Sequence, residues 1–377
     1  GISLQEEMCL QCKQLNLAPG GPDDSDGIPA FLSKALTPPH QKSVTNALEL
    51  LVELGAMDEE TNELTDLGKC LSVLSLEPRV GKMVIWAHLL GCAKLGISMG
   101  VSMSYKPPFA LPPPHLRKKA ELVKIELSKN SESDQITVLH ALHSRDQFIN
   151  QSTTGAFYTY CKSRFISPTV LNMIADLRKN TSRELISLGF PPYQVAGYHN
   201  RHEDYPDQSA FLQAAIIAGL YPNVAHRSRG DMNFSTMTNR KAKVHISSLN
   251  AIKGQRLQGK CACPKGEVEF IVFGEMVKGA NSFTMSQTTF LTSPLPLILL
   301  CGDIRVRPFH SEFISCDQPK LSILSIDEWL MFQCQTDIAS ALVILRKRME
   351  TIFLNLVMNP QARLSSLNPA EKDALET

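Results

Sequence analysis

The densest group of residues that could do chemistry is a run of cations between positions 224 and 265. This segment holds nine Lys and Arg residues and one acid, Asp231, so its charge is +8 in a chain whose total is +1. The cations are Arg227, Arg229, Arg240, Lys241, Lys243, Lys253, Arg256, Lys260 and Lys265. Cations and short polar donors bind phosphates, and planar side chains stack on bases. The segment therefore predicts contact with a nucleic acid, and a solvated barrel loop is the alternative.

Common catalytic motifs are absent from the sequence. No Gly-Lys pair of the chain is followed by Ser or Thr, so no P-loop can cradle a nucleotide. The patterns Gly-x-Gly-x-x-Gly, Gly-x-Ser-x-Gly and His-Glu-x-x-His are missing as well. We expect no catalytic residue in this chain.

Three groups of residues could be considered as metal ligands, but none has a complete set. They are Cys9 with Cys12 on a predicted helix, Cys261 with Cys263 in a turn, and the polar cluster of His199, His202, Glu203 and Asp204. No second pair lies at the spacing of a zinc finger. Core thiols and a solvated loop are the favoured interpretations, and we expect no metal.

Length and composition limit the class of protein. At roughly 100–200 residues per domain, 377 residues suggest two or three domains. A hydrophobic share of 43% with 20% charged residues excludes global disorder, and 10 cysteines are too few for a disulfide scaffold. Lys82, His88 and Lys94 interrupt the longest apolar region, which favours a buried helix over a membrane span. We expect an intracellular, cytoplasmic or nuclear protein without a signal peptide, and, because it begins at Gly1, part of a longer chain.

The N-terminal 77 residues have the pattern of a winged helix. A helix-like period from Ser43 ends at Gly55, and an acidic turn between Met57 and Leu64 suits a short β-hairpin. Thr65 is a candidate N-cap for a second helix.

The rest of the chain predicts a helical region and then a small barrel. Residues 78–223 are almost wholly helical in pattern, with proline-rich breaks. Residues 224–325 contain short apolar segments between Gly and Pro turns, including 244–249 and 295–300, and predict a small β-barrel. Residues 326–362 predict a C-terminal helix, and 363–377 a polar tail. The fold class is α+β multidomain: winged helix, helical bundle, β-barrel, terminal helix.

Several motifs, in this order, resemble the C-terminal region of DEAH/RHA-type RNA helicases, most closely the RHA-like branch. The segment 46–56, Leu64-Thr65-Asp66-Leu67-Gly68 and Pro78-Arg79-x-x-Lys82-Met83 are similar to the winged helix of that family. Ser104-Tyr105-Lys106-Pro107-Pro108-Phe109 and Ser133-Asp134-Gln135 resemble its ratchet-like domain, with Gln135 in place of His. The segment 244–250 resembles an OB-fold strand, with Ile246 in place of Pro.

The resemblance implies a role in binding RNA. The complete protein would hydrolyse ATP with Mg in two RecA-like motor domains, which this chain lacks, and would move 3′ to 5′ on RNA. Single-stranded RNA, or structured RNA with a single-stranded 3′ end, the motor domains and an activator protein on the OB-fold are the implied partners, and no membrane. The expected RNA-facing residues are Arg227, Arg229, Arg240, Lys241, Lys243, His245, Ser247, Ser248 and Asn250. Gln135 and Ile246 differ from the family residues, so the resemblance does not predict which contacts they make.

Two other classes were weighed. A winged-helix DNA-binding regulator is disfavoured because acids in the wing and second helix, such as Asp58 and Glu63, would repel a duplex. A stand-alone thiol or zinc hydrolase lacks a readable nucleophile, base and orienting group.

Overall fold

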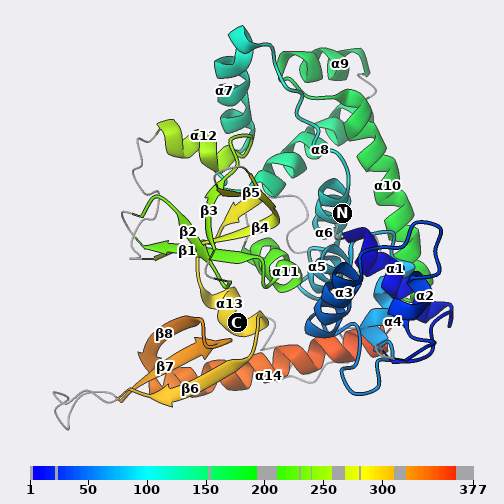
Figure 1. Cartoon of the computed structure of the whole chain (residues 1–377). Coiled ribbons are helices and arrows are strands. Elements are labelled where there is room, and N and C mark those ends of the chain that lie inside the picture. The colour runs from blue at the N-terminus through cyan, green and yellow to red at the C-terminus, as the bar shows by residue number, and fades with distance from the viewer. Residues whose placement is uncertain are drawn as a thin grey trace.

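The computed structural model describes residues 3–21, 24–151, 154–192, 210–228, 231–238, 240–256, 268–279, 282–309 and 320–361 (Figure 1). The first part is helical. Its elements are α1 (Ser3–Gln14), α2 (Ile28–Leu32), α3 (Gln41–Glu53), α4 (Asp66–Val73), α5 (Pro78–Leu89), α6 (Ala93–Ser104), η1 (Pro114–Leu116), α7 (Arg117–Leu127), α8 (Asp134–Asn150), α9 (Thr154–Ser163), α10 (Pro168–Ser187) and α11 (Ala210–Leu220).

The second part combines strands and helices. Its elements are β1 (Val224–Ser228), β2 (Phe234–Thr236), β3 (Lys241–Val244), α12 (Leu249–Arg256), β4 (Val268–Lys278), β5 (Phe283–Phe290), α13 (Leu295–Leu300), β6 (Ile304–Pro308), β7 (Leu321–Ile326), β8 (Leu330–Gln335) and α14 (Thr336–Met358). The expected polar tail at 363–377 lies outside the described residues. No helix within the described ranges is both long and apolar enough to cross a membrane.

The predicted helix, turn and helix of the N-terminal part are present as α3, the segment 57–64 and α4. The α3 helix buries Val44, Ala47, Leu50 and Leu51 at helical spacing and ends at Gly55, whose φ of 77° suits glycine. The hydroxyl of Thr65 accepts a hydrogen bond from the backbone N–H of Gly68 at 3.1 Å, which confirms the N-cap. The acidic turn is closed by a single β-bridge, between Met57 and Leu64.

Close helix packing at the centre depends on glycine. The α11 helix lies against α5, and a Cβ at Gly219 would stand 2.3 Å from the Cβ and 2.6 Å from the Cα of Met83. One large apolar core runs from α1 through α5, α6 and α11 to α14. The ring of Trp86 stacks on Phe353 of α14 at 4.3 Å between centroids, which fixes the last helix against α5.

Five strands form a closed barrel in the order β1-β2-β3-β5-β4, consistent with an OB fold. All neighbouring strands are antiparallel except β3 and β5, which are parallel. The barrel has a small core of its own, formed by Ala225, Phe234, Ala242, Ile271, Phe273 and Met285. Each of the five strands therefore pairs with a neighbour on both sides.

The C-terminal part differs from the sequence expectation in three places. The apolar run 295–300, expected as a strand, is the short helix α13, because Pro294 and Pro296 start a helix readily and cannot complete a ladder. Residues 330–335, expected in the terminal helix, form β8 in a separate sheet of order β6-β7-β8. The segment 244–249 is not one strand, since β3 ends at Val244 and α12 begins at Leu249.

Candidate nucleic-acid interface

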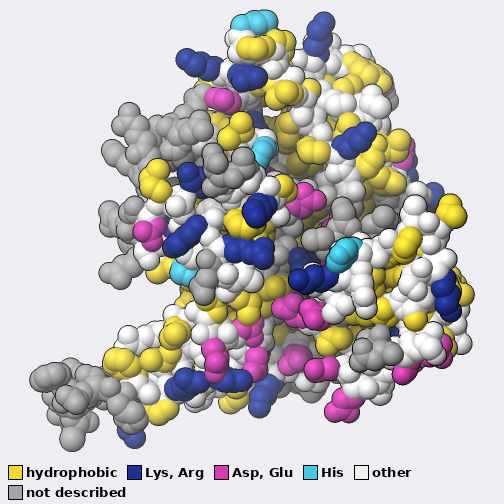
Figure 2. Space-filling view, in the orientation of Figure 1, with side chains coloured by type: hydrophobic (Ala, Val, Ile, Leu, Met, Phe, Trp, Pro, Cys, Tyr) yellow, Lys and Arg dark blue, Asp and Glu magenta, His cyan; other side chains and the backbone are white. Residues whose placement is uncertain are grey.

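Three exposed cations of the barrel lie on β3 and at the residue before it. Alternation along the strand points Ala242 into the barrel, where it is 0% exposed, and leaves Lys241 and Lys243 exposed on the outer face. Arg240 precedes the strand and is exposed as well. Figure 2 shows Lys and Arg side chains over the barrel strands on the face turned to the viewer. The three residues predicted to face RNA are thus exposed within four consecutive positions, and their contact with RNA stays a prediction.

Two of these cations are held by their neighbours. The guanidinium of Arg240 lies over the ring of Phe283, with Cζ 5.2 Å from the ring centroid. The ammonium of Lys241 donates a hydrogen bond to the hydroxyl of Ser235 at 2.9 Å, across the β2–β3 pair. Both contacts leave the cations exposed while limiting their rotamers, which reduces the entropy lost when an anion binds.

His245 and Ser247 extend this surface beyond the end of β3. Both side chains are exposed, and Nδ1 of His245 lies 2.7 Å from the hydroxyl of Ser247. The backbone N–H of His245 donates to the carbonyl of Met285 at 2.8 Å and so continues the β3–β5 pairing. An imidazole and a hydroxyl then stand beside the strand cations, where they can donate to phosphate or sugar oxygens.

Arg227 is placed differently from the β3 cations. It lies on β1, and its Nε donates to Oε2 of the buried Glu269 at 2.5 Å. Its guanidinium also stacks on Phe234, with Cζ 4.6 Å from the ring centroid. The carboxylate of Glu269 competes with any phosphate for this cation. Arg229 lies outside the described residues.

Ser248 and Asn250 were expected on the RNA-facing surface, but the structure buries them. Their exposed fractions are 3% and 7%. The amide of Asn250 donates to the carbonyl of Glu132 at 3.1 Å and to the hydroxyl of Thr288 at 2.9 Å. Both residues therefore hold the start of α12 against β5 and the segment before α8. In this arrangement they position the exposed neighbours and do not face solvent themselves.

Asp134 is the centre of this buried network. Its carboxylate accepts hydrogen bonds from the hydroxyl of Ser248 at 2.5 Å, the backbone N–H of Leu249 at 2.8 Å and the backbone N–H of Thr288 at 3.0 Å. Lys124 pairs with it at 3.3 Å, and the two side chains are only 14% and 13% exposed. One carboxylate at the start of α8 thus fastens α12 and β5 of the barrel to the helical part.

The same Lys124 reaches the candidate surface. Its ammonium donates to the carbonyl of Ser247 at 2.7 Å and lies 5.0 Å from the ring centroid of Phe109. In the sequence nothing distinguishes Lys124 from the other cations of its helix, Arg117, Lys118 and Lys119. Only the arrangement in space identifies it as the link between α7 and the loop after β3.

Gln135, which replaces the family histidine, has a complete set of partners. Its Nε2 donates to the carbonyl of Gln287 at 2.6 Å, and its Oε1 accepts from the hydroxyl of Thr289 at 2.6 Å. Gln287 has a φ of 52° and lies across the sheet from Gly274, where a Cβ would meet its Oε1 at 2.2 Å. Its Nε2 donates to the carbonyl of Met103 at the end of α6. Gln135 and Gln287 thus connect the start of α8, β5 and the end of α6.

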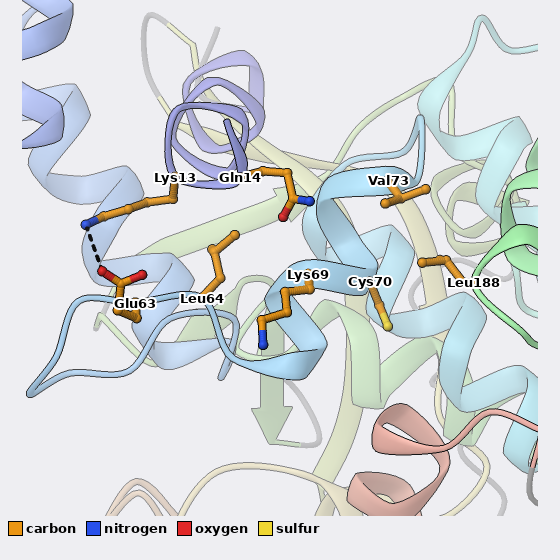
Figure 3. A pocket seen from close by; sticks show the side chains of 8 residues that line it. All are labelled: Lys13, Gln14, Glu63, Leu64, Lys69, Cys70, Val73 and Leu188. Carbon is orange, nitrogen blue, oxygen red and sulfur yellow. Dashed lines mark ion pairs between the residues drawn. The ribbon is translucent and has the colours of Figure 1, made fainter. Parts of the chain in front are cut away.

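A pocket of about 440 Å³ lies on the other side of the molecule, between α1, the 57–64 turn and α4 (Figure 3). Lys13 lies at its edge and pairs with Glu63 at 3.9 Å, while its Nζ also donates to the carbonyls of Pro19 and Gly20. Burial raises the pKa of the Cys70 thiol to about 11, so this lining residue stays protonated at neutral pH. Lys13 therefore serves to hold the N-terminal loop, and the pocket offers no activated nucleophile.

The two described thiols that were considered as metal ligands, Cys9 and Cys12, are core residues. Cys9 and Cys12 are buried on α1, and burial raises the pKa of Cys9 to about 12, which opposes the thiolate that zinc requires. Among the described residues, no group of three or more His, Cys, Asp or Glu residues could hold a metal. The candidates at 199–204 and 261–263 lie outside those residues.

Two domain families match the chain. The family described as oligonucleotide/oligosaccharide-binding (OB)-fold matches residues 212–304, which include all five barrel strands. The helicase associated domain (HA2), winged-helix, matches residues 47–76. Together they define a helicase-associated region that carries an OB fold.

Curated relatives agree with this class. The human ATP-dependent RNA helicase DHX29 is 28% identical over 96% of this chain and 25% of its own length. The human ATP-dependent DNA/RNA helicase DHX36 is 27% identical over 94% of this chain and 32% of its own, and the Arabidopsis thaliana helicase DExH6 is 29% identical over 81% and 22%. The chain thus spans about a quarter to a third of most of these relatives. These matches support a similarity between this chain and the C-terminal region of DEAH/RHA-type helicases.

Proposed function

We propose that this chain is the accessory C-terminal region of an ATP-dependent 3′-to-5′ RNA helicase. The barrel binds single-stranded RNA, and the helical part transmits movement between that strand and RecA-like motor domains outside this chain. Residues 1–77 act as a winged helix that contacts the motor, and residues 78–223 act as the ratchet-like domain. ATP and Mg bind to the motor domains, and the chain alone has no ATPase activity. An activator protein that binds the barrel remains part of the proposal.

The observation that carries the proposal is the exposed row Arg240, Lys241, Lys243 and His245 on one strand and its continuation. A motor must hold any sequence, so its contacts should go to phosphates and sugars and not to base edges. Cations with a planar imidazole and hydroxyls suit that requirement. Arg240 and Lys241 are also restrained by Phe283 and Ser235, which favours a defined binding surface.

The buried attachment of the barrel supports the second half of the proposal. Asp134 and Gln135 at the start of α8 bind backbone and side-chain groups of β5 and the start of α12. A strand held by the barrel would therefore be mechanically connected to α8 by groups that are mostly buried. A region that passes movement from the bound RNA to the motor domains requires such a connection.

Binding of the full chain to single-stranded RNA and to duplex DNA of matched length tests the proposal. We expect tighter binding of single-stranded RNA, with little difference between unrelated sequences. Preference for the duplex, or strong preference for one sequence, would instead support a winged-helix DNA-binding regulator. An ATPase assay on the same chain is expected to give no turnover.

A further inference from the structure

The α7 helix projects from the body of the protein and carries a second group of exposed cations. Leu127, at its C-terminal end, is the one residue of the helix that is buried. At the other end His115, Arg117, Lys118 and Lys119 are all exposed, and no acid occurs in the first turn. Figure 1 places this end at the edge of the molecule, away from the winged-helix part and α14. The helix thus contributes little to the core and presents charge instead.

The position of α7 relative to the barrel is fixed. It contacts α8 and α12, and Lys124 binds the carbonyl of Ser247 at 2.7 Å. Arg117 precedes Lys124 by seven residues, so it lies on the same side of the helix and about 10 Å further out. Arg117 therefore continues the line of cations from the loop that follows β3, while Lys118 and Lys119 lie about 100° and 200° further round the helix. Figure 2 shows Lys and Arg side chains over α7 and over the barrel on the same face.

The chemistry of the α7 end differs from that of the barrel surface. The segment 111–124 contains four cations but no Phe, Tyr or Trp. Proteins that hold unpaired bases usually offer aromatic rings for stacking, whereas duplex RNA is bound largely through phosphates and 2′-hydroxyls. Cations without aromatic rings therefore suit a nucleic acid whose bases are already paired.

We infer that the exposed end of α7 binds the backbone of a duplex or folded RNA segment that flanks the strand held by the barrel. This inference rests on the proposed function of the barrel. It makes the preferred ligand a junction between a single strand and a duplex, with the strand on β3 and the duplex phosphates on Arg117, Lys118 and Lys119.

The test compares the binding of four RNAs to the full chain: a single strand, the same strand with a hairpin at its 5′ end, the same strand with a hairpin at its 3′ end, and the blunt hairpin alone. Fluorescence anisotropy gives each dissociation constant over a range of salt. We expect one of the joined RNAs to bind at least fivefold more tightly than the single strand. In R117Q/K118Q/K119Q this gain should disappear, and the salt dependence for the joined RNA should fall by up to about 0.9 per lost contact. Affinity for the single strand should stay within twofold.

K347Q/R348Q on α14 is the control, because these exposed cations lie at the opposite side of the molecule in Figure 1. Misfolding is an unlikely confounder for the α7 variant, since cations in the first turn of a helix oppose its dipole and their removal should stabilise it. Circular dichroism checks this directly. The inference would be overturned if R117Q/K118Q/K119Q lost equal affinity for the single strand and the joined RNA. It would also be overturned if the hairpin gave the unmodified chain no gain in affinity. The barrel is tested separately by variants of the β3 cations, in which binding of the single strand should be lost.

Discussion

The carboxylate of Asp134 accepts a hydrogen bond from the hydroxyl of Ser248 at 2.5 Å, and this pair joins the helical part to the barrel. The two residues are 114 positions apart in the sequence. Ser248 precedes α12, and the exposed His245 and Ser247 lie immediately before it. The geometry of the candidate surface therefore depends on a carboxylate in another part of the chain.

Replacing Asp134 should detach the barrel from α8. In D134N one acceptor oxygen becomes a donor and faces the N–H of Leu249 or of Thr288, and Lys124 loses its carboxylate partner. Breaking one member of such a buried charged network costs about 3–5 kcal/mol in the free energy of unfolding. Urea denaturation measures this change. The exposed pair of Asp176 with Lys179 provides the control D176N, for which no change is expected. A D134N protein as stable as the unmodified chain would contradict the role of Asp134.

Gln135 allows a graded test of the same junction. Q135L removes the donor to Gln287 and the acceptor for Thr289, and unpaired buried groups of this kind cost about 1–3 kcal/mol each. Q135H can donate from one ring nitrogen and accept at the other, so it should recover most of the loss. Thermal unfolding of the two variants checks the order. If histidine is as damaging as leucine, the hydrogen bonds of Gln135 do not explain its place in the junction.

Gly219 should tolerate no side chain. In G219A the new Cβ would stand 2.3 Å from the Cβ of Met83 and 2.6 Å from its backbone, so α11 and α5 must separate. We expect a loss of at least about 1–3 kcal/mol from overpacking. G155A is the matched control, because nothing lies within 4 Å of its Cβ and alanine favours a helix. Chemical denaturation of both variants should give opposite signs, and equal stability would contradict the packing.

The stability contributed by Glu6 should depend on pH. Burial raises the pKa of this carboxyl from 4.5 to about 7, although the nearby Arg79 lowers it. Between pH 4.5 and 7 the folded state therefore holds a proton that the unfolded state has released, and stability falls as the pH rises. E6Q removes this penalty, so its stability relative to the unmodified chain should increase from pH 5 to pH 8, by up to about 3 kcal/mol.

Urea midpoints at the two pH values measure the effect of Glu6, with E59Q on the exposed turn as the control. Burial of His88 lowers its pKa to about 4, so this residue makes the free energy of unfolding rise with pH. Because both proteins contain His88, the difference between E6Q and the unmodified chain isolates the effect of Glu6. An E6Q difference that is the same at pH 5 and pH 8 would contradict a buried, neutral Glu6.

The sequence predicted the order of the main elements because their signals are local. The Thr65 cap, the glycine after α3 and the alternation of β3 each need only a few neighbouring residues. The alternation of Leu330, Phe332 and Cys334 with polar or exposed neighbours is also a strand signal, and it was overlooked because the following helix pattern is stronger. A six-residue apolar run such as α13 cannot be assigned by period alone, although its two prolines favour a helix.

The candidate surface could be predicted only in part, for a tertiary reason. Charge density alone located Arg240, Lys241 and Lys243. The burial of Ser248 and Asn250 depends on Asp134 and Thr288, whose proximity follows from docking of the barrel on α8. Arg227 was predicted to face RNA, and its partner Glu269 is 42 residues away on the neighbouring strand. A local sequence pattern cannot predict such contacts between residues that are far apart in the chain.

The most direct test of the central claim is the salt dependence of single-stranded RNA binding by R240E/K241E/K243E. The control K42E/K347E/R348E changes the net charge equally at exposed positions on α3 and α14. If β3 holds the phosphates, the first variant should bind every sequence at least tenfold more weakly, and the slope of log affinity against log salt should fall by about 0.7 for each lost contact. The control should retain its affinity within about threefold. Equal losses of affinity in both variants, or an unchanged salt slope for R240E/K241E/K243E, would show that the RNA strand does not lie on β3.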